Sequence, residues 1–167
     1  MSIKKSLSIS FFILPAVFII IQFFHPTKNT TSDISIYKND ISTIYFVPDN
    51  VHQILKASCY DCHSNNTQYP WYNNIQPVAW WLDHHVKEGK RALNFSEFAS
   101  YSIRKKYKKL DGLIKEIQSD KMPLPSYTLI HRYAILTPDQ KDKLINWATA
   151  IRDSIKSSTP ADSLIKK

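Results

Sequence analysis

Apolar side chains recur at intervals of three and four residues in four stretches of the chain between residues 49 and 156. This interval places them on one face of an α-helix. The pattern predicts helices from residue 49 or 50 into the segment near residue 62, from 77 to about 89, from 96 or 97 to 118, and from 137 to about 155. The chain has only two glycines, which argues against tight hairpins and parallel α/β turns. The expected fold class is therefore all-α.

The N-terminus carries an apolar stretch from Leu7 to Phe24, preceded by Lys4 and Lys5. Basic residues ahead of an apolar segment are typical of an export signal and predict that the N-terminus stays in the cytoplasm. No small-residue cleavage site follows Phe24, so an uncleaved transmembrane anchor over residues 1–26 is favoured over a removed signal peptide or a buried core helix. The remainder is then expected on the periplasmic side of the inner (cytoplasmic) membrane.

Residues 27–45 are rich in Ser, Thr, Asn, Asp and Lys and show no lasting period, as is typical of a linker. Residues 46–156 then form one domain, and about 110 residues are enough for a compact hydrophobic core. Residues 157–167 are interpreted as a tail. The expected organisation is an anchor, a linker, one helical domain and a short tail.

Residues 59–63 read Cys-Tyr-Asp-Cys-His, the attachment motif of c-type haem. Two thiols three positions apart on one helical face can each add to a vinyl group of the same porphyrin, which leaves the next side chain below the iron. We therefore expect one haem c bound covalently through Cys59 and Cys62, with His63 as the first axial ligand. Export is consistent with this chemistry, because c-type haem is generally attached outside the cytoplasm, where free thiols also risk oxidation.

A Cys-x-x-Cys pair can also be a thioredoxin-type redox centre, half of a zinc site or a short-loop disulfide. The zinc interpretation is weak because Cys59 and Cys62 are the only cysteines of the chain. A thioredoxin-like centre would need a strand before the motif and an alternating α/β pattern, and the sequence shows neither. Haem attachment is the favoured interpretation.

A second segment that can serve the iron is Lys-Met-Pro-Leu-Pro-Ser-Tyr at residues 121–127. Its two prolines oppose a helix and favour a stiff, extended loop. Met122 is the only methionine besides Met1, and a thioether held on such a loop is expected to be the second axial ligand. The alternative role for Met122 is to fill a gap in the core, and His131 is the competing sixth ligand.

Among the other histidines, His52, His84 and His85 are expected to be surface or packing residues, with at most one of the adjacent pair facing inward. Aromatic residues are expected to form the core and the wall of an apolar haem pocket. These aromatic residues are Tyr69, Trp71, Tyr72, Trp80, Trp81, Phe95 and Tyr127, with Trp71 and Tyr72 flanking the porphyrin.

With both segments in view, the chain resembles the bacterial haem-binding domain proteins, small cytochrome c-like domains that usually follow an N-terminal anchor. The resemblance extends from about Val47 to Arg152. It is carried by CYDCHSN at 59–65, YPWY at 69–72, the helix from 81 to 89 that ends in HVKEG, LNFS at 93–96 and MPLPSY at 122–127. It implies a cytochrome c-like helical fold around one covalent haem and no particular substrate. His84 beside His85 is a small departure from the family pattern.

The net charge is +8 with a sequence pI near 9.4, and lysines concentrate between Lys87 and Lys121. They can form a solvated helix face, or a landing surface for an acidic redox protein or anionic lipid headgroups. Nucleic acid is not expected as a partner of an exported domain. No Ser/His/Asp set, paired carboxylates in a defined pocket or phosphate-binding glycine loop is visible. Electron transfer is therefore favoured over catalysis, with a peroxidase-like haem enzyme or a haem-based redox or gas sensor as alternatives.

Overall fold

The computed structural model describes residues 3–31 and 38–164, and within these ranges every regular element is a helix. The prediction of an all-α fold is confirmed. The α-helices are α1 (Ile3–Ile21), α2 (Asp49–Ser58), α3 (Tyr60–His63), α4 (Val78–Ala92), α5 (Ile103–Gln118), α6 (Pro125–Thr128), α7 (Pro138–Ser158) and α8 (Ala161–Leu164). Short 3-10 helices are η2 (Ile41–Thr43), η3 (Trp71–Asn74), η4 (Phe95–Ser100) and η5 (Arg132–Ala134).

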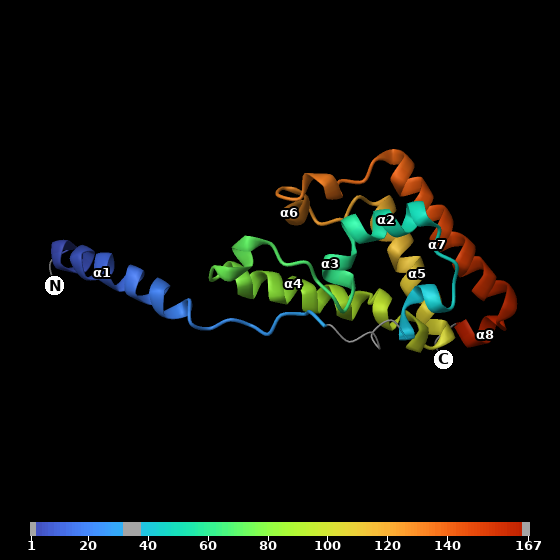
Figure 1. Ribbon diagram of the computed structural model, residues 1–167, viewed down its shortest axis with the longest axis horizontal. Helices are drawn as coiled ribbons and strands as arrows, with labels where there is room; N and C mark the ends of the chain where they lie inside the picture. Colours follow the sequence, from blue (N-terminus) through green and yellow to red (C-terminus); the bar gives the residue numbers. More distant parts are fainter. Residues whose placement is uncertain (1–2, 32–37, 165–167) are drawn as a thin grey trace.

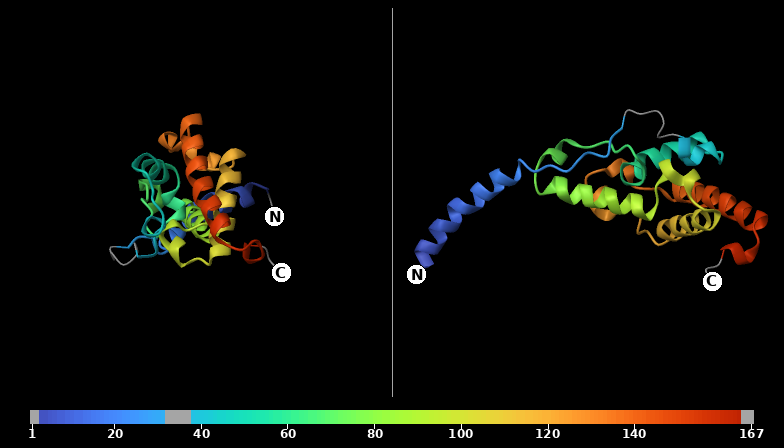
Figure 2. Two further views of the ribbon diagram at one scale, coloured as in Figure 1. Left: turned by 90° about the vertical axis from the view of Figure 1, so that its right-hand side faces the viewer. Right: turned by 90° about the horizontal axis from the view of Figure 1, so that it is seen from below.

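Helices α2 to α8 form the body of the molecule, and α1 projects from one end of it (Figure 1 and Figure 2). Helices α5 and α7 make the most extensive contact between two elements, and α2 packs on α7. Fully buried side chains from these helices and η4, among them Leu55, Phe98, Leu110 and Leu144, belong to one hydrophobic core. The short helix α3 contacts α4 on one side and α2 on the other, so the cysteine motif lies between these two helices.

The helix expected from residue 96 or 97 begins later than predicted. The 3-10 helix η4 comes first, and α5 starts only at Ile103. Asn94 precedes η4 and Ser102 precedes α5, and each side chain accepts a hydrogen bond from a backbone N–H of the turn that follows. Because such a cap stabilises a helix start at its own position, two elements replace the single predicted helix.

The starts of two other helices depend on caps and prolines. Helix α7 has the predicted capping box, in which Thr137 Oγ1 accepts the N–H of Gln140 at 3.2 Å and Gln140 Oε1 accepts the N–H of Thr137 at 2.9 Å. The loop after α5 was expected to contain no helix, yet α6 begins at Pro125. This expectation was wrong because proline is tolerated at the first helical position, where its missing N–H would have no partner.

Helix α4 runs on to Ala92, past the stop predicted near Gly89. Gly89 has a different role, because a Cβ built there would lie 2.5 Å from the carbonyl oxygen of Cys62 and 2.9 Å from the Cβ of Cys62. Only a residue without a side chain permits α4 and the cysteine motif to approach this closely.

Within residues 3–31 and 38–164, no helix combines the length and the apolar character needed to cross a membrane, so the expected transmembrane anchor gains no support from the structure.

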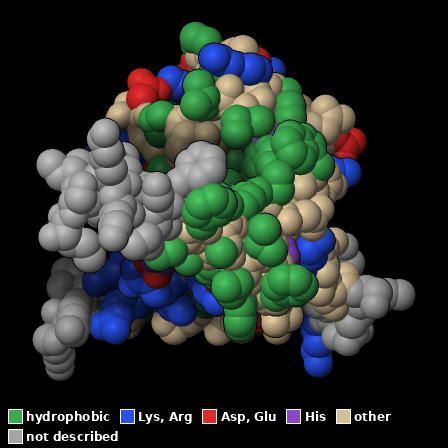
Figure 3. Space-filling view, turned by 90° about the vertical axis from the view of Figure 1, so that its left-hand side faces the viewer, with side chains coloured by type: hydrophobic (Ala, Val, Ile, Leu, Met, Phe, Trp, Pro, Cys, Tyr) green, Lys and Arg blue, Asp and Glu red, His purple; other side chains and the backbone are tan. Residues whose placement is uncertain are grey.

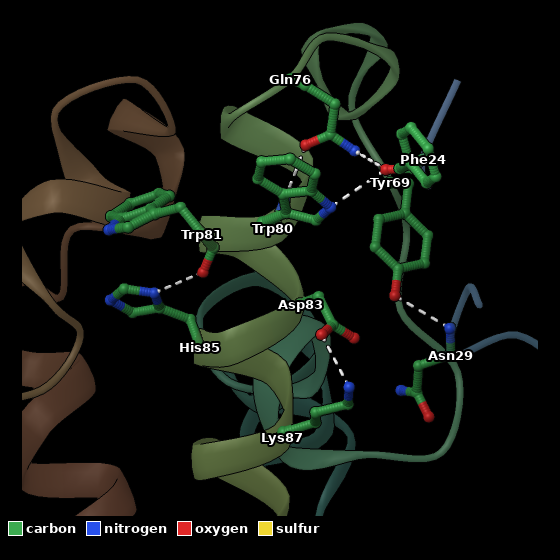
Figure 4. Close-up of polar contacts among 9 residues, drawn as sticks. All are labelled: Phe24, Asn29, Tyr69, Gln76, Trp80, Trp81, Asp83, His85 and Lys87. Atoms are coloured by element: carbon green, nitrogen blue, oxygen red, sulfur yellow. Dashed lines mark hydrogen bonds and ion pairs between the residues drawn. The ribbon is translucent and has the colours of Figure 1, made fainter. Parts of the chain in front are cut away.

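The chain directly after α1 is hydrogen-bonded to the start of α4. The N–H of Gln76 donates to Gln22 Oε1 at 2.9 Å, and Gln22 Nε2 donates to the carbonyl of Gln76 at 3.3 Å. The carbonyl of Phe24 accepts hydrogen bonds from Gln76 Nε2 at 2.6 Å and from Trp80 Nε1 at 3.0 Å (Figure 4). These bonds tie the N-terminal segment to the body of the molecule.

Asn29, within the stretch interpreted as a linker, makes a second set of contacts. Its N–H donates to the hydroxyl of Tyr69 at 2.9 Å (Figure 4). Its side-chain amide donates to the carbonyl of Ser64 and to the hydroxyl of Thr67, both at 2.9 Å. This part of the polar stretch therefore lies against the loop that follows the cysteine motif.

Candidate functional site

The cysteine motif occupies a break between two helices. Helix α2 ends at Ser58, Cys59 departs from helical geometry with φ −130°, and α3 then carries Cys62 and His63. The N–H groups of Cys62 and His63 both donate to the carbonyl of Cys59, at 3.2 and 2.9 Å, which keeps the short turn compact. Both cysteines carry free thiols, so the structure shows no disulfide between them.

Two adjoining cavities, of about 350 and 520 Å³, open beside this motif. Both have Cys59, His63 and Met122 in their walls, and Ser58, Ala92 and Pro123 complete the shared lining. Cys62 faces the first cavity. The structure thus brings the two cysteines, the histidine of the motif and the distant methionine to one space, although Met122 lies on the far side of α5 in the sequence.

The imidazole of His63 has a defined orientation. Its Nδ1 lies 2.9 Å from the carbonyl oxygen of Leu93, directly after α4. A carbonyl can only accept, so Nδ1 holds the proton and Nε2 keeps its lone pair. Burial lowers the pKa of His63, and this outweighs the opposing effect of the Leu93 and Gly89 carbonyls. The ring is therefore neutral at physiological pH, the form that binds a metal ion.

The two thiols are also held in their neutral form. Burial, with a smaller contribution from the neighbouring Cys62, raises the pKa of Cys59 to about 12. Burial and the adjacent Asp61 raise the pKa of Cys62 to about 11. A thioredoxin-type centre depends on a thiol whose pKa is depressed, so these values argue against that alternative.

The loop that carries Met122 is fixed at both ends. The N–H groups of Lys121 and Met122 both donate to the carbonyl of Glu116 near the end of α5, at 3.0 and 3.2 Å. At the other end, the Tyr127 hydroxyl donates to Asp61 Oδ2 at 2.7 Å. Asp61 belongs to the cysteine motif, so the methionine loop is bonded directly to the motif it faces.

His131, the competing sixth ligand, is engaged elsewhere. Its Nε2 lies 2.7 Å from the hydroxyl of Tyr72, and its Nδ1 lies 2.8 Å from the hydroxyl of Tyr133. Its ring stacks on Tyr127 with 4.4 Å between ring centroids. Neither cavity has His131 in its lining, so the structure does not bring this imidazole to the space that Met122 faces.

The aromatic wall expected from the sequence is present only in part. Tyr127 lines the first cavity and Phe95 the second, and the other five residues named for that wall line neither. Trp71, expected to flank the porphyrin, has 76% of its surface exposed. The sequence identifies aromatic residues but does not tell which of them face the cavity.

Several polar residues of the cavity walls were not identified as site residues from the sequence. His84 and His85 both line the first cavity, together with Glu88 and Arg91, contrary to the expectation that at most one histidine faces inward. The spacing of residues 84, 85 and 88 along one face of α4 is the signal that could have identified them. Lys108 and Lys109 line the second cavity.

Within the part of the chain that the structure describes, no three His, Cys, Asp or Glu side chains come together in a way that could hold a metal ion.

A comparison with known protein families matches residues 16–150 to the haem-binding domain family. The chain belongs to this family. The match confirms the resemblance inferred from the motifs, and haem binding follows from it. It also extends further toward the N-terminus than the motifs do, and includes Gln22, Phe24 and Asn29, which contact the body of the molecule. No curated protein and no solved structure matches the chain.

The residues of the two cavities fit a haem. Two free thiols and a neutral imidazole lie on one short segment, and a thioether lies on the loop opposite. The rest of the second cavity is largely apolar, with Leu93, Phe95, Leu113, Ile117 and Leu136 in its wall. A large porphyrin needs an apolar surround of this kind together with a few polar groups that fix its orientation.

Proposed function

We propose that this haem-binding domain carries one haem c, attached by thioether bonds to Cys59 and Cys62, and transfers electrons without transforming a substrate. His63 and Met122 are the proposed axial ligands. The observation that carries the proposal is that Cys59, His63 and Met122 share the wall of both cavities. When bound, a haem supplies an iron that alternates reversibly between the ferrous and ferric states.

The protein's own groups prepare both ligand positions. The Leu93 carbonyl holds the proton on Nδ1 of His63, which directs the Nε2 lone pair away from that bond. The Met122 thioether is a soft ligand that favours reduced iron and raises the potential of a haem. Because the loop is bonded to Glu116 near the end of α5 and, through Tyr127, to Asp61, the position of the thioether relative to the cysteine motif is held from both ends. With His63 and Met122 both holding the iron, no coordination position would remain for a substrate.

A haem enzyme is the second candidate, and one observation favours it. His85 and Glu88 line the same cavity as Met122 and could move protons for a peroxidase-like reaction. That reaction requires an open iron position and therefore a labile Met122.

The proposed location is the periplasmic face of the inner membrane, with the N-terminus inside. It is supported by the basic residues that precede the apolar N-terminal stretch. The proposed partner is an acidic redox protein, and Lys108 and Lys109 in the wall of the second cavity support it by placing positive charge beside the haem site. Intact-mass measurement on membrane-purified protein tests the anchor, since loss of the N-terminal residues would reveal a cleaved signal peptide.

The haem proposal is tested on the full chain produced together with a cytochrome c maturation system. Haem should stay with the polypeptide through acid-acetone extraction and denaturing electrophoresis. Cys59→Ser and Cys62→Ser should each weaken or abolish this attachment, and the reduced wild type should bind carbon monoxide poorly. Freely extractable haem would contradict the covalent bond, and tight carbon monoxide binding would favour the enzyme or a gas sensor.

A further inference from the structure

Large apolar side chains are exposed at the end of the molecule from which α1 projects. We define the aromatic face by Phe23, Trp71, Trp80, Leu129, Ile130 and Tyr133, whose exposed fractions are 81, 76, 41, 66, 59 and 67%. Figure 3 looks onto this end and shows hydrophobic side chains gathered across it. Monomeric soluble proteins rarely leave such residues together in water, so the face is expected to have an occupant.

Contacts between neighbouring residues connect the parts of this face. Trp71 packs edge to face on Tyr72, with 5.8 Å between ring centroids. Tyr72 is hydrogen-bonded to His131, which is hydrogen-bonded to Tyr133, so η3 and the segment after α6 are joined. On the other side, Trp80 donates to the carbonyl of Phe24, which joins α4 to the chain leaving α1.

The end of α1 is fixed relative to the aromatic face. Gln76 has no exposed surface, and it forms three hydrogen bonds to Gln22 and Phe24, which directly follow the C-terminal end of α1, here called its foot. Beyond that foot, every residue from 12 to 20 is exposed, and the large apolar ones range from 48% for Val17 to 72% for Phe12. Two apolar surfaces therefore meet at one end of the molecule, one on a helix and one on the domain.

The helix limits which occupant is possible. Because consecutive residues are exposed around its whole circumference, whatever covers α1 has to surround it rather than contact one stripe. A lipid bilayer does this without a complementary shape, whereas a folded protein partner would have to enclose the helix and also match the aromatic face.

We propose that the aromatic face rests on the surface of a lipid bilayer into which α1 is inserted. Tryptophan and tyrosine combine an apolar ring with a polar N–H or O–H, and this suits them to the boundary between acyl chains and headgroups. The hydrogen bonds at Gln76 then hold the domain in one orientation on the membrane instead of letting it move freely on a tether. This inference rests on the proposed membrane location and is independent of what the haem does.

The test uses the full chain carrying 5-fluorotryptophan, bound to phosphatidylcholine and phosphatidylglycerol vesicles with or without lipids that bear a nitroxide near the headgroup. Single Trp→Phe variants assign the fluorine resonances. The nitroxide should broaden the signals of Trp71 and Trp80 and leave that of Trp147 sharp. Trp147 is an internal control, because it is 8% exposed and its indole N–H donates to the carbonyl of Phe46.

Leu129→Ser combined with Ile130→Ser should reduce the broadening of Trp71, while Trp80, whose indole is bonded to the carbonyl of Phe24 at the end of α1, stays broadened and the protein still floats with the vesicles. The control Ile103→Ser changes a residue of 40% exposure at the start of α5 and should alter neither result. Vesicle-bound protein in which Trp71 and Trp80 stay as sharp as Trp147 would overturn the inference. So would broadening that occurs without nitroxide and grows with protein concentration, since it would identify a second copy as the occupant. Protein that does not float at all would contradict the membrane location itself, and none of these three outcomes bears on the haem.

Discussion

The Tyr127 hydroxyl donates a 2.7 Å hydrogen bond to Oδ2 of Asp61 and so connects the loop of Met122 to the turn between Cys59 and Cys62. Asp61 is an interior residue of the attachment motif, where its side chain is not needed for thioether formation. Its other carboxylate oxygen accepts the N–H of Gln68 at 3.1 Å. One carboxylate therefore bonds both the methionine loop and the segment that follows the cysteine motif.

Tyr127→Phe should disturb the methionine ligand without removing it. The lost bond has a carboxylate acceptor, so the expected decrease in the free energy of unfolding is about 1.5 kcal/mol, the lower end for such bonds because Tyr127 is only partly buried. The far-red sulfur-to-iron charge-transfer band should also weaken. If Tyr127 contributed to stability alone, this band would not change. Tyr69→Phe is the control, since it removes a hydroxyl that accepts the N–H of Asn29 and is not bonded to Asp61. Equal effects in both variants would deny Asp61 a special role.

Met122→Ala should remove the charge-transfer band of the oxidised protein, lower the reduction potential and admit carbon monoxide to the reduced iron. His131→Ala should leave the band in place, because both imidazole nitrogens lie against tyrosine hydroxyls. Absorption spectroscopy and redox titration of the two variants provide the measurements. If the His131 variant loses the low-spin spectrum and the Met122 variant keeps it, the iron has two histidine ligands instead.

Gly89→Ala and Gly112→Ala should change stability in opposite directions. Both glycines are in helices, where alanine is favoured by about 1 kcal/mol. At Gly89 the added methyl would meet the backbone of Cys62 at 2.5 Å, and overpacking against backbone costs about 1–3 kcal/mol, so the net effect is destabilising. At Gly112, which lines the second cavity, no protein atom lies within 4 Å, so the stability of the haem-free protein should rise. Equilibrium denaturation of identically prepared proteins ranks the three. A Gly89→Ala variant with an unchanged free energy of unfolding would mean that α3 can shift away from α4 at little cost.

The rate of electron transfer to an anionic oxidant should depend on Lys108 and Lys109. With ferricyanide as the probe, the second-order rate for the reduced protein should fall as ionic strength rises from about 0.01 to 0.15 M, because salt screens the attraction. Lys108→Glu with Lys109→Glu should lower the low-salt rate and flatten this dependence. Lys56→Glu with Lys156→Glu makes the same change in net charge at other exposed positions and serves as the control. Stopped-flow absorption gives the rates. If both double variants behave identically, the net charge of the protein sets the rate and the position of Lys108 and Lys109 does not matter.

The features that could be predicted from the sequence are those fixed by local chemistry. The capping box at Thr137 and Gln140 acts within one turn, and so it was found at its expected place. Apolar residues continue at helical spacing on both sides of Ser102, so their pattern does not show that a new helix begins there. For this reason the later start of α5, which the Ser102 side chain caps, was missed. A pattern of apolar residues does not by itself weigh one cap against another.

The sequence pattern did not predict contacts between distant segments. The bond between Asp61 and Tyr127 joins residues whose polar side chains could equally have faced water. The two histidines of α4 were assigned to different helical faces, yet a wide cavity accommodates both. Asn29 was placed in a linker because its surroundings lack a period, and its partners lie in a loop far along the chain.

The hydrogen bonds at Gln76 affect how this protein can be processed and produced. A peptidase cut just after Phe24 would remove Gln22 and Phe24, which bond the backbone and the side chain of a residue with no exposed surface. Each buried group left without a partner costs about 1–3 kcal/mol. A fragment intended for crystallisation should accordingly start before Gln22, even though the polar stretch after α1 looks like the natural place to cut.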